Sequence, residues 1–438
     1  MRGDKAKEIL VQLASSGLPP RDITAASEEL PMFSVGLEEW IDRLAAEYLG
    51  FLCRSQCHFK ILLAPYGGGK THFLMALGVR ALAENYAVSY VACVPGKPGS
   101  GPRVDDPMGL YSEVVGHLQL PQGSGKGLLP ILQGVVESKR KMIQESGAAD
   151  PDRAFDLYRR QLRSRFPGAQ FGDFAHVMSL ALHGVWAEQE DTASFRGAEK
   201  WLEGRMSSLS KDEWSALSLR SPTVAQSVEL GGKLLLAMAN FLPDAGVHGL
   251  VLLIDEVETM FTAKGKALQA VLGAMRKMTD WSGSGPKKAP ILGIFAAVPD
   301  VEQELRRYPG LEQRYKVMGA SFEEGNDSAP VINLEKVRKD QLTLLTEIGI
   351  KLVDLGVLAS DAKLDREVQL ENARRLARIS AKMNLDVDSR RLYVKACAGL
   401  LQLQIAKGSR LVSEDELGER YRGEFNQMRT TEKAEFEG

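Results

Sequence analysis

The stretch that decides the fold is His58–Leu82, HFKILLAPYGGGKTHFLMALGVRAL. Its first part, Phe59–Leu63, is a short apolar run without helical periodicity, and it predicts a buried β-strand. Three consecutive glycines follow, and apolar residues then recur at helical spacing from Phe73 to Ala81. A strand, a glycine-rich turn and a helix in this order predict a phosphate-binding loop.

The turn and the residues after it form the predicted nucleotide site. Glycines let successive backbone N–H groups face an anion, and the helix that follows adds the positive end of its dipole. Lys70 is expected to reach the β- and γ-phosphates of ATP, and the Thr71 hydroxyl to bind Mg²⁺. The predicted nucleotide-binding residues are Ala64, Pro65, Tyr66, Gly67, Gly68, Gly69, Lys70, Thr71 and His72.

One position departs from the pattern G-x-x-x-x-G-K-[ST]. Ala64 stands where the pattern has its first glycine. Alanine fits there if its φ is negative, and Gly67 and Gly68 keep the loop pliant. The alternative interpretation is a glycine-rich turn with a chance Lys-Thr pair, and the flanking strand and helix disfavour it.

A second motif, Gly249–Glu256, reads GLVLLIDE. Five successive apolar residues predict a parallel strand buried on both faces, with two carboxylates at its C-terminal end, where open α/β sheets bind ligands. Asp255 is expected to hold Mg²⁺ or its water ligands, and Glu256 to act as the base for the attacking water. Alone, the pair would equally suit a solvated strand end or a helix cap.

Composition sets broad limits on the chain. Its 438 residues are enough for more than one domain, and 55 Lys and Arg against 57 Asp and Glu leave no global field for nucleic acid or membranes. No run has membrane-spanning length and residues 1–30 lack a signal-peptide core, so a cytoplasmic protein is expected. The four cysteines do not suggest disulfides, and Cys53 and Cys57 lack a second pair of metal ligands.

The periodicity predicts five regions. They are an N-terminal helical segment (1–57), a P-loop part of the ATPase core (58–107), a helical insertion (108–245), a second core part with the Asp-Glu strand (246–335), and a helical lid with the C-terminal region (336–438). The segment 33–37 is a candidate to pack on adenine, with a structural role equally open. Arginines 153, 159, 160, 163 and 165 in the insertion suit either a nucleic-acid contact or a solvated face.

Other arginines are weaker candidates. A further central strand is expected over Pro290–Val298, and it ends without the polar sensor residue of AAA+ ATPases, although Asp300 is a substitute. Arg306, Arg307 and Arg314 follow as candidates for a finger onto a neighbouring subunit, or as plain surface residues. Arg390 and Arg391 open a C-terminal helix from which they are expected to reach the phosphates.

Five stretches together resemble the BrxD family, ATP-binding proteins of BREX bacteriophage-exclusion systems, and more broadly AAA+/STAND-type ATPases. They are Gly17–Arg21 with Phe33–Gly36, Tyr66–Phe73, Trp201–Gly204, Gly249–Thr259, and the helix that begins at Arg390-Arg391. The forms Tyr-Gly-x-Gly-Lys-Thr-x-Phe and Asp-Glu-Val-Glu-Thr are the specific ones. The family usually has a small polar residue near Ala297, and its absence puts sensor-type control in doubt.

The resemblance implies ATP hydrolysis in phage defence, beside partners that include a helicase, a phosphatase-like protein and a DNA methyltransferase. The expected fold is an α/β P-loop NTPase of the ASCE/AAA+ type, a parallel sheet with helices on both faces, acting as a homo-oligomer or within a complex. Two alternatives stay open: a nucleotide-dependent switch or scaffold with slow hydrolysis, and a DNA-binding loader or motor resembling replication initiators. An ABC-type ATPase is disfavoured because no LSGGQ-like segment precedes Asp255.

Overall fold

The computed structural model describes residues 2–18, 22–30, 34–50, 56–121, 125–166, 169–281, 289–316, 322–323, 325–336, 340–383 and 389–437. Within them, five strands form one sheet in the order β2-β3-β4-β1-β5, and every neighbouring pair is parallel. The strands are β1 (Cys57–Leu63), β2 (Ala87–Ala92), β3 (Leu250–Asp255), β4 (Ile291–Ala297) and β5 (Val331–Asn333). The expected parallel sheet is confirmed.

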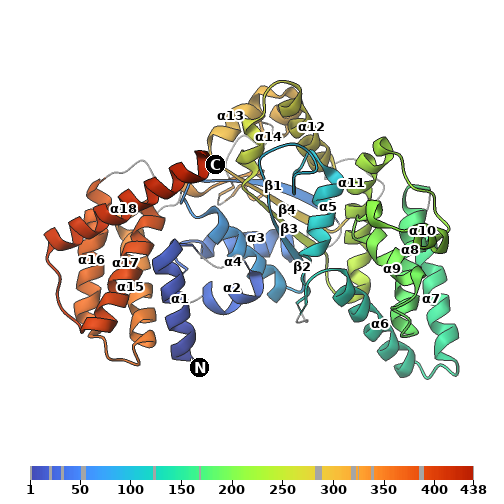
Figure 1. Cartoon of the computed structure of the whole chain (residues 1–438), viewed down its shortest axis with the longest axis horizontal. Coiled ribbons are helices and arrows are strands. Elements are labelled where there is room, and N and C mark those ends of the chain that lie inside the picture. The colour runs from blue at the N-terminus through green and yellow to red at the C-terminus, as the bar shows by residue number, and fades with distance from the viewer. Residues whose placement is uncertain are drawn as a thin grey trace.

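Helices cover both faces of this sheet (Figure 1). Before β3 they are α1 (Arg2–Ser16), α2 (Ile23–Glu29), α3 (Glu38–Leu44), α4 (Lys70–Ala83), α5 (Pro107–Gly116), α6 (Leu128–Glu145), α7 (Pro151–Arg165), α8 (Ala169–Trp186), α9 (Ala193–Leu202), α10 (Lys211–Leu217) and α11 (Val224–Phe241). After β3 they are α12 (Lys266–Asp280), α13 (Asp300–Arg307), α14 (Pro309–Lys316), α15 (Gln341–Ala359), α16 (Arg366–Met383), α17 (Ser389–Lys407) and α18 (Glu414–Glu437).

Alternation of side chains along the strands divides the interior into two cores. Leu250, Leu252 and Ile254 of β3 join one core, while Val251 and Leu253 join the other. Such alternation follows from the strand period of two, and both sets are apolar because helices cover both faces. The sheet therefore acts as a shared wall between two hydrophobic cores.

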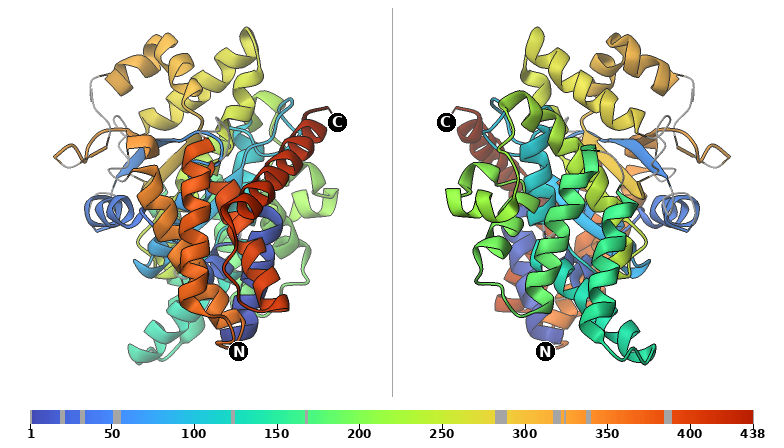
Figure 2. Two further views of the ribbon diagram at one scale, coloured as in Figure 1. Left: turned by 90° about the vertical axis from the view of Figure 1, so that its left-hand side faces the viewer. Right: turned by 90° about the vertical axis from the view of Figure 1, so that its right-hand side faces the viewer.

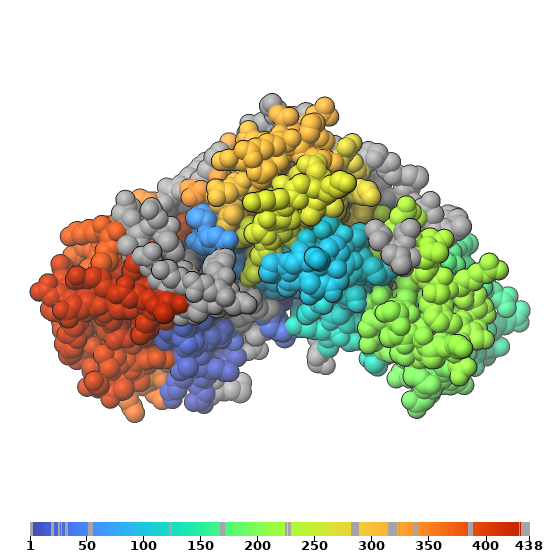
Figure 3. Space-filling model, turned by 45° about the horizontal axis from the view of Figure 1, so that its top comes forward, coloured from blue at the N-terminus to red at the C-terminus, as the bar shows by residue number. Residues whose placement is uncertain are grey.

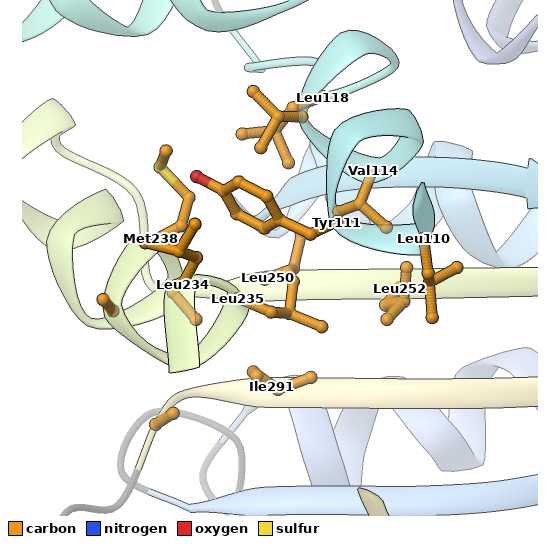
Figure 4. Close-up of a cluster of buried hydrophobic side chains, with 14 of the residues drawn as sticks. Leu110, Tyr111, Val114, Leu118, Leu234, Leu235, Met238, Leu250, Leu252 and Ile291 are labelled. Carbon is orange, nitrogen blue, oxygen red and sulfur yellow. The ribbon is translucent and has the colours of Figure 1, made fainter. Parts of the chain in front are cut away.

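On the first face, α5 and α11 pack together and α5 contacts β2, and Figure 4 shows their side chains near Leu250 and Leu252 of β3 and Ile291 of β4. Figure 4 shows Tyr111 of α5 between Met238 and Leu235 of α11 and the strand residue Leu250. The Tyr111 hydroxyl donates to the backbone oxygen of Leu202, 2.5 Å away, at the end of α9. This contact joins the sheet-covering helices to the group α6–α10, which lies beyond them at one end of the molecule.

The opposite end of the molecule is built by α15–α18 together with α1. Helix α1 packs against α15 and α17, so the first described helix is part of the C-terminal bundle (Figure 2). In the space-filling view the two helical ends stand apart, with α12–α14 between them (Figure 3). Helix α4 packs beneath the sheet, against strands β2, β3 and β4.

The observed elements follow the sequence patterns closely in the core and less closely near the N-terminus. Strand β4, Ile291–Ala297, lies within one residue of its expected bounds, Pro290–Val298. Helix α2 was not expected, and α3 passes into a π-helix at Ala45–Leu49. No helix among the described residues is apolar over a length that would cross a membrane.

Strand β1 carries one charge inside the core. Lys60 is buried, and its Nζ donates to the backbone oxygens of Asp327 and Ala329 at 3.2 and 2.5 Å. The ammonium also lies over the rings of Tyr48 and Phe322, 4.3 and 4.5 Å from their centroids. Carbonyl dipoles and ring quadrupoles thus replace water around a charge that would otherwise be costly to bury.

A close approach between β1 and β4 generates the first prediction. Gly293 of β4 pairs with Phe59 of β1, and a Cβ on Gly293 would lie 2.2 Å from the Phe59 ring. Gly293→Val is expected to destabilise the fold by about 1–3 kcal/mol through overpacking. Denaturant unfolding measures the loss, with Gly172→Ala as control, since a Cβ there meets no atom within 4 Å. Equal stability of the valine variant and wild type would contradict this packing.

Candidate functional site

The loop between β1 and α4 has the backbone of an anion nest. Gly67 and Gly69 have φ of +64° and +92°, in the region that favours glycine. Gly68 has no room for a side chain, since a Cβ there would lie 2.8 Å from the Ala64 Cβ. The three glycines therefore allow the tight turn that leads into the N-terminus of α4, at Lys70.

Ala64, the departure from the P-loop pattern, fits this loop. It is fully buried and is not among the residues with positive φ, so it meets the condition set for an alanine at this place. Its amide donates to the backbone oxygen of Ala297, 3.2 Å away, at the end of β4. The start of the loop is thereby tied to the neighbouring strand.

Lys70 lies at the centre of the site with its ammonium already surrounded. Its Nζ donates to the backbone oxygens of Ala64 and Pro65 at 3.2 and 3.4 Å. It also lies 3.3 Å from Oε1 of Glu258 and 5.0 Å from the centroid of the Tyr66 ring. These contacts hold the Lys70 ammonium inside the loop that is expected to bind the phosphates.

Thr71 and Asp255 meet although they are far apart in sequence. The Thr71 hydroxyl donates to Asp255 Oδ2 at 2.6 Å, and the Tyr90 hydroxyl donates to the same oxygen at 2.9 Å. Asp255 is fully buried at the end of β3, where its other oxygen accepts the Glu256 amide at 2.9 Å. A hydroxyl and a carboxylate in contact are ligands of the kind that Mg²⁺ takes.

Glu256 adopts an unusual backbone conformation. Its φ and ψ are +55° and +33°, left-handed for a residue with a side chain. Such conformations cluster at functional sites. The turn redirects the chain into a 3₁₀ helix, Val257–Thr262, that carries Glu258 back to Lys70.

Tyr66 lies on the outer side of the loop and is 60 % exposed. Partial burial raises the pKa of its hydroxyl, and the carboxylates of Glu258, Glu256 and Asp300 raise it further. Asp300, the substitute sensor, is thus electrostatically linked to the loop.

His72 links α4 to the segment proposed for adenine. Its Nε2 lies 2.6 Å from the Ser34 hydroxyl, and burial lowers the pKa of His72 to about 4. Residues 34–37 of that segment are described, whereas Phe33 lies outside the described residues. The neutral imidazole of His72, one residue after Thr71, therefore holds Ser34 against the start of α4.

The two arginines of α17 have different neighbours. Arg390 donates from Nη1 to the backbone oxygen of Gly68 at 2.9 Å, so the C-terminal bundle contacts the loop directly. Burial lowers the pKa of Arg390, and Glu335 opposes that effect. Arg391 donates from Nε to the Ser16 oxygen at 3.0 Å, which holds it against the end of α1.

The remaining arginine and cysteine candidates either form other contacts or lie outside the described residues. Arg306 and Arg307 pair with Glu302 and Glu304 on their own helix, at 2.6 and 2.5 Å, and are well exposed. The side chain of Arg314 and all of Cys53 lie outside the described residues. Cys57, Cys93 and Cys397 are buried and form no disulfide with one another, and no cluster of metal-ligating side chains was found in the described part of the chain.

Two polar residues of the site, Tyr90 and Glu258, were not among the predicted site residues. Tyr90 reaches Asp255 because β2 pairs with β3 in the register that sets Ala92 beside Asp255. Glu258 reaches Lys70 through the left-handed turn at Glu256. Tyr90 carries a hydroxyl near the end of an apolar strand, and Glu258 falls within the Asp-Glu-Val-Glu-Thr form, but the sequence does not show that either side chain reaches the site.

The parallel sheet, the glycine-rich loop before α4 and the carboxylate at the end of β3 fit the class of P-loop NTPases. Within that class, the chain belongs to the family of BREX system ATP-binding proteins BrxC/D, whose model matches residues 7–433. The resemblance inferred from the motifs is thus confirmed over nearly the whole chain, and the protein is an ATP-binding protein of an anti-phage defence system. Searches of curated proteins and of solved structures gave no match.

The low pKa of His72 predicts a pH-dependent stability. His72 titrates near 4 in the folded chain and near 6.5 when unfolded, so its neutral form stabilises the fold fully above about pH 6.5. That contribution is lost as the pH falls from 6.5 toward 4, by roughly 2 kcal/mol at pH 5.

Chemical denaturation at pH 7 and pH 5 measures the effect. His72→Gln keeps a polar partner for Ser34 and is expected to lose less stability at pH 5 than wild type does. His117→Gln, on an exposed side chain, is the control and should follow wild type. An identical pH dependence in wild type and His72→Gln would contradict the assignment.

Proposed function

We propose that the protein hydrolyses ATP at this site and that hydrolysis serves the defence system. The observation that carries the proposal is the contact of Thr71 with Asp255 at 2.6 Å, directly beside the buried ammonium of Lys70. Together these groups supply a hydroxyl, a carboxylate and a cation at the C-terminal edge of a parallel sheet, where open α/β folds bind ligands.

In the proposed mechanism the protein mainly positions charges. The loop amides and Lys70 bind the β- and γ-phosphates and neutralise charge as the terminal P–O bond breaks. Mg²⁺ would be held by Thr71 and, directly or through water, by Asp255, and it neutralises phosphate charge when bound. Glu256 accepts the proton of the attacking water, and its place one residue after Asp255 supports this role.

Further features support an ASCE/AAA+ type of core. Strand β4 lies between β1 and β3, so the loop strand and the Asp-Glu strand are separated by one strand. The Arg390 contact with Gly68 supports a C-terminal lid that senses nucleotide. We retain the five-region division as a proposal, with the addition that α1 packs in the C-terminal bundle.

Action with other defence proteins follows from membership of a BREX system. The helicase, phosphatase-like and methyltransferase partners are kept as proposals, as are an oligomeric or complexed state and a cytoplasmic location.

The loader alternative rests on arginines of α7. Arg163 contacts His176 at 2.8 Å and Arg165 pairs with Asp244 at 2.6 Å, so these two serve the insertion's own packing. The nucleotide switch therefore remains the nearer alternative.

Removing the lysine tests the binding site. Lys70→Ala deletes the ammonium that neutralises the phosphates and leaves Glu258 without its counter-charge. ATP binding is expected to weaken by roughly a hundredfold or more. Equilibrium titration with a fluorescent ATP analogue measures it, beside Lys233→Ala as a distant control. Wild-type affinity in Lys70→Ala would remove the loop from consideration as the ATP site.

Replacing the proposed base separates binding from turnover. Glu256→Gln keeps the shape of the side chain and removes its basicity, so ATP binding should persist while turnover falls roughly 10²- to 10⁴-fold. Steady-state phosphate release of the purified protein measures this, with Glu304→Gln on α13 as control. An active Glu256→Gln variant would place the base elsewhere, and a wild type that binds ATP without turnover would favour the switch.

A further inference from the structure

Glu258 contacts the ammonium group of Lys70, which is expected to bind phosphate. Its Oε1 lies 3.3 Å from Lys70 Nζ, and the two side chains are only 7 % and 9 % exposed. No role in the P-loop pattern calls for a carboxylate here. A carboxylate and a phosphate offer the same thing to an ammonium group, namely anionic oxygen acceptors.

The segment that carries Glu258 is well anchored. The 3₁₀ helix Val257–Thr262 begins directly after the left-handed Glu256, and Val257 and Met260 are fully buried. The side chain of Glu258 is therefore presented to Lys70 by a fixed piece of backbone and is not a chance contact of a solvated residue.

The pair is nevertheless incompletely satisfied. Oε2 of Glu258 is buried and has no hydrogen-bond partner within the described ranges. Burial raises the pKa of the Glu258 carboxyl, and the charge of Lys70 only partly offsets this. A buried carboxylate with an unmet oxygen is costly. A ligand that takes Lys70 and lets Glu258 move toward water would relieve that cost.

We propose that Glu258 is a displaceable stand-in for phosphate: it occupies Lys70 in the nucleotide-free protein and is expelled by the β- and γ-phosphates. The proposal rests on the assignment of the ATP site above. Glu258 is thus a positioning residue that lowers nucleotide affinity, and its displacement marks the change from the empty to the occupied site.

The neighbours of the 3₁₀ helix indicate where the displacement is felt. The Val104 amide donates to Sδ of Met260 at 3.4 Å, and beside it Arg103 forms a buried ion pair with Asp105. Asp106 then caps α5 by accepting the Gly109 amide at 3.0 Å. A shift of Glu258 therefore acts on the loop that starts α5, the helix joined to the insertion.

Nucleotide titrations of the purified full-length chain test the proposal. ATP is titrated into the Glu256→Gln variant, which is expected not to turn ATP over. ADP and AMP are titrated into both the wild type and the Glu256→Gln variant. Each titration is repeated with Glu258→Gln added. Glu258→Gln is expected to bind ATP and ADP roughly five- to thirtyfold more tightly. AMP affinity should not change, because AMP has no β-phosphate to compete for Lys70. A merely structural role of Glu258 would not distinguish ADP from AMP.

Glu213→Gln is the matched control. Glu213 also forms a largely buried pair with a lysine, Lys200, at 2.7 Å, and lies in the insertion. Its substitution should leave the affinities for all three nucleotides unchanged. Tighter ADP binding by this variant, equal to that of Glu258→Gln, would overturn a specific role for Glu258.

The outcomes separate the two proposals. Unchanged or weaker ADP binding by Glu258→Gln, with Lys70→Ala still defective, overturns the stand-in and leaves the ATP site intact. A wild type that binds no ATP overturns both. If Glu258→Gln does not fold, amide hydrogen exchange of the wild type decides: ADP should change exchange over residues 257–262 and at Val104, and no change there overturns the proposal.

Discussion

Burial of both faces of the five-stranded sheet is the constraint on which the rest of this structure depends. With helices on each side, most strand residues are buried and apolar on both faces. Lys60 is a buried charge within β1, and two carbonyl oxygens and two aromatic rings replace its hydration. Functional polar groups therefore gather where the strands end, which brings Thr71, Asp255 and Tyr90 to one edge.

The same sheet lies between the two helical groups at the ends of the molecule, α6–α10 and α15–α18 with α1. Each packs on its own side of the sheet. Among the described residues, Arg390 contacts Gly68 from the C-terminal bundle, and the Val104–Met260 contact joins the Asp-Glu segment to the loop before α5. The site edge is therefore in contact with elements on both sides of the sheet.

Sequence patterns were sufficient for whatever depends on period and strand order. Apolar runs predicted strands β1, β3 and β4, and helical spacing predicted helix α4. The contact between Thr71 and Asp255 follows once these strands are parallel. Glu258 and Tyr90 could not be predicted in the same way. Their placement depends on a left-handed residue and on strand register, and neither leaves a periodic trace in the sequence.

The N-terminal region was the least predictable for a related reason. The sequence predicted an N-terminal helical segment, but the apolar residues of a helix do not show which surface it will cover. Its partners proved to be α15 and α17, far along the chain, and Arg391 holds the Ser16 carbonyl at that junction. Such long-range docking is determined by the whole fold and not by local sequence.

That docking has a consequence for biosynthesis. The apolar stripe of α1 leaves the ribosome long before α15 and α17 exist, and at ordinary rates of translation the delay is roughly tens of seconds. During that time Ile9, Leu10 and Leu13, which end up buried, have no native surface to cover. In the nascent chain these apolar side chains therefore lack their α15 and α17 partners until the C-terminal bundle has been synthesised, so α1 can dock there only at a late stage.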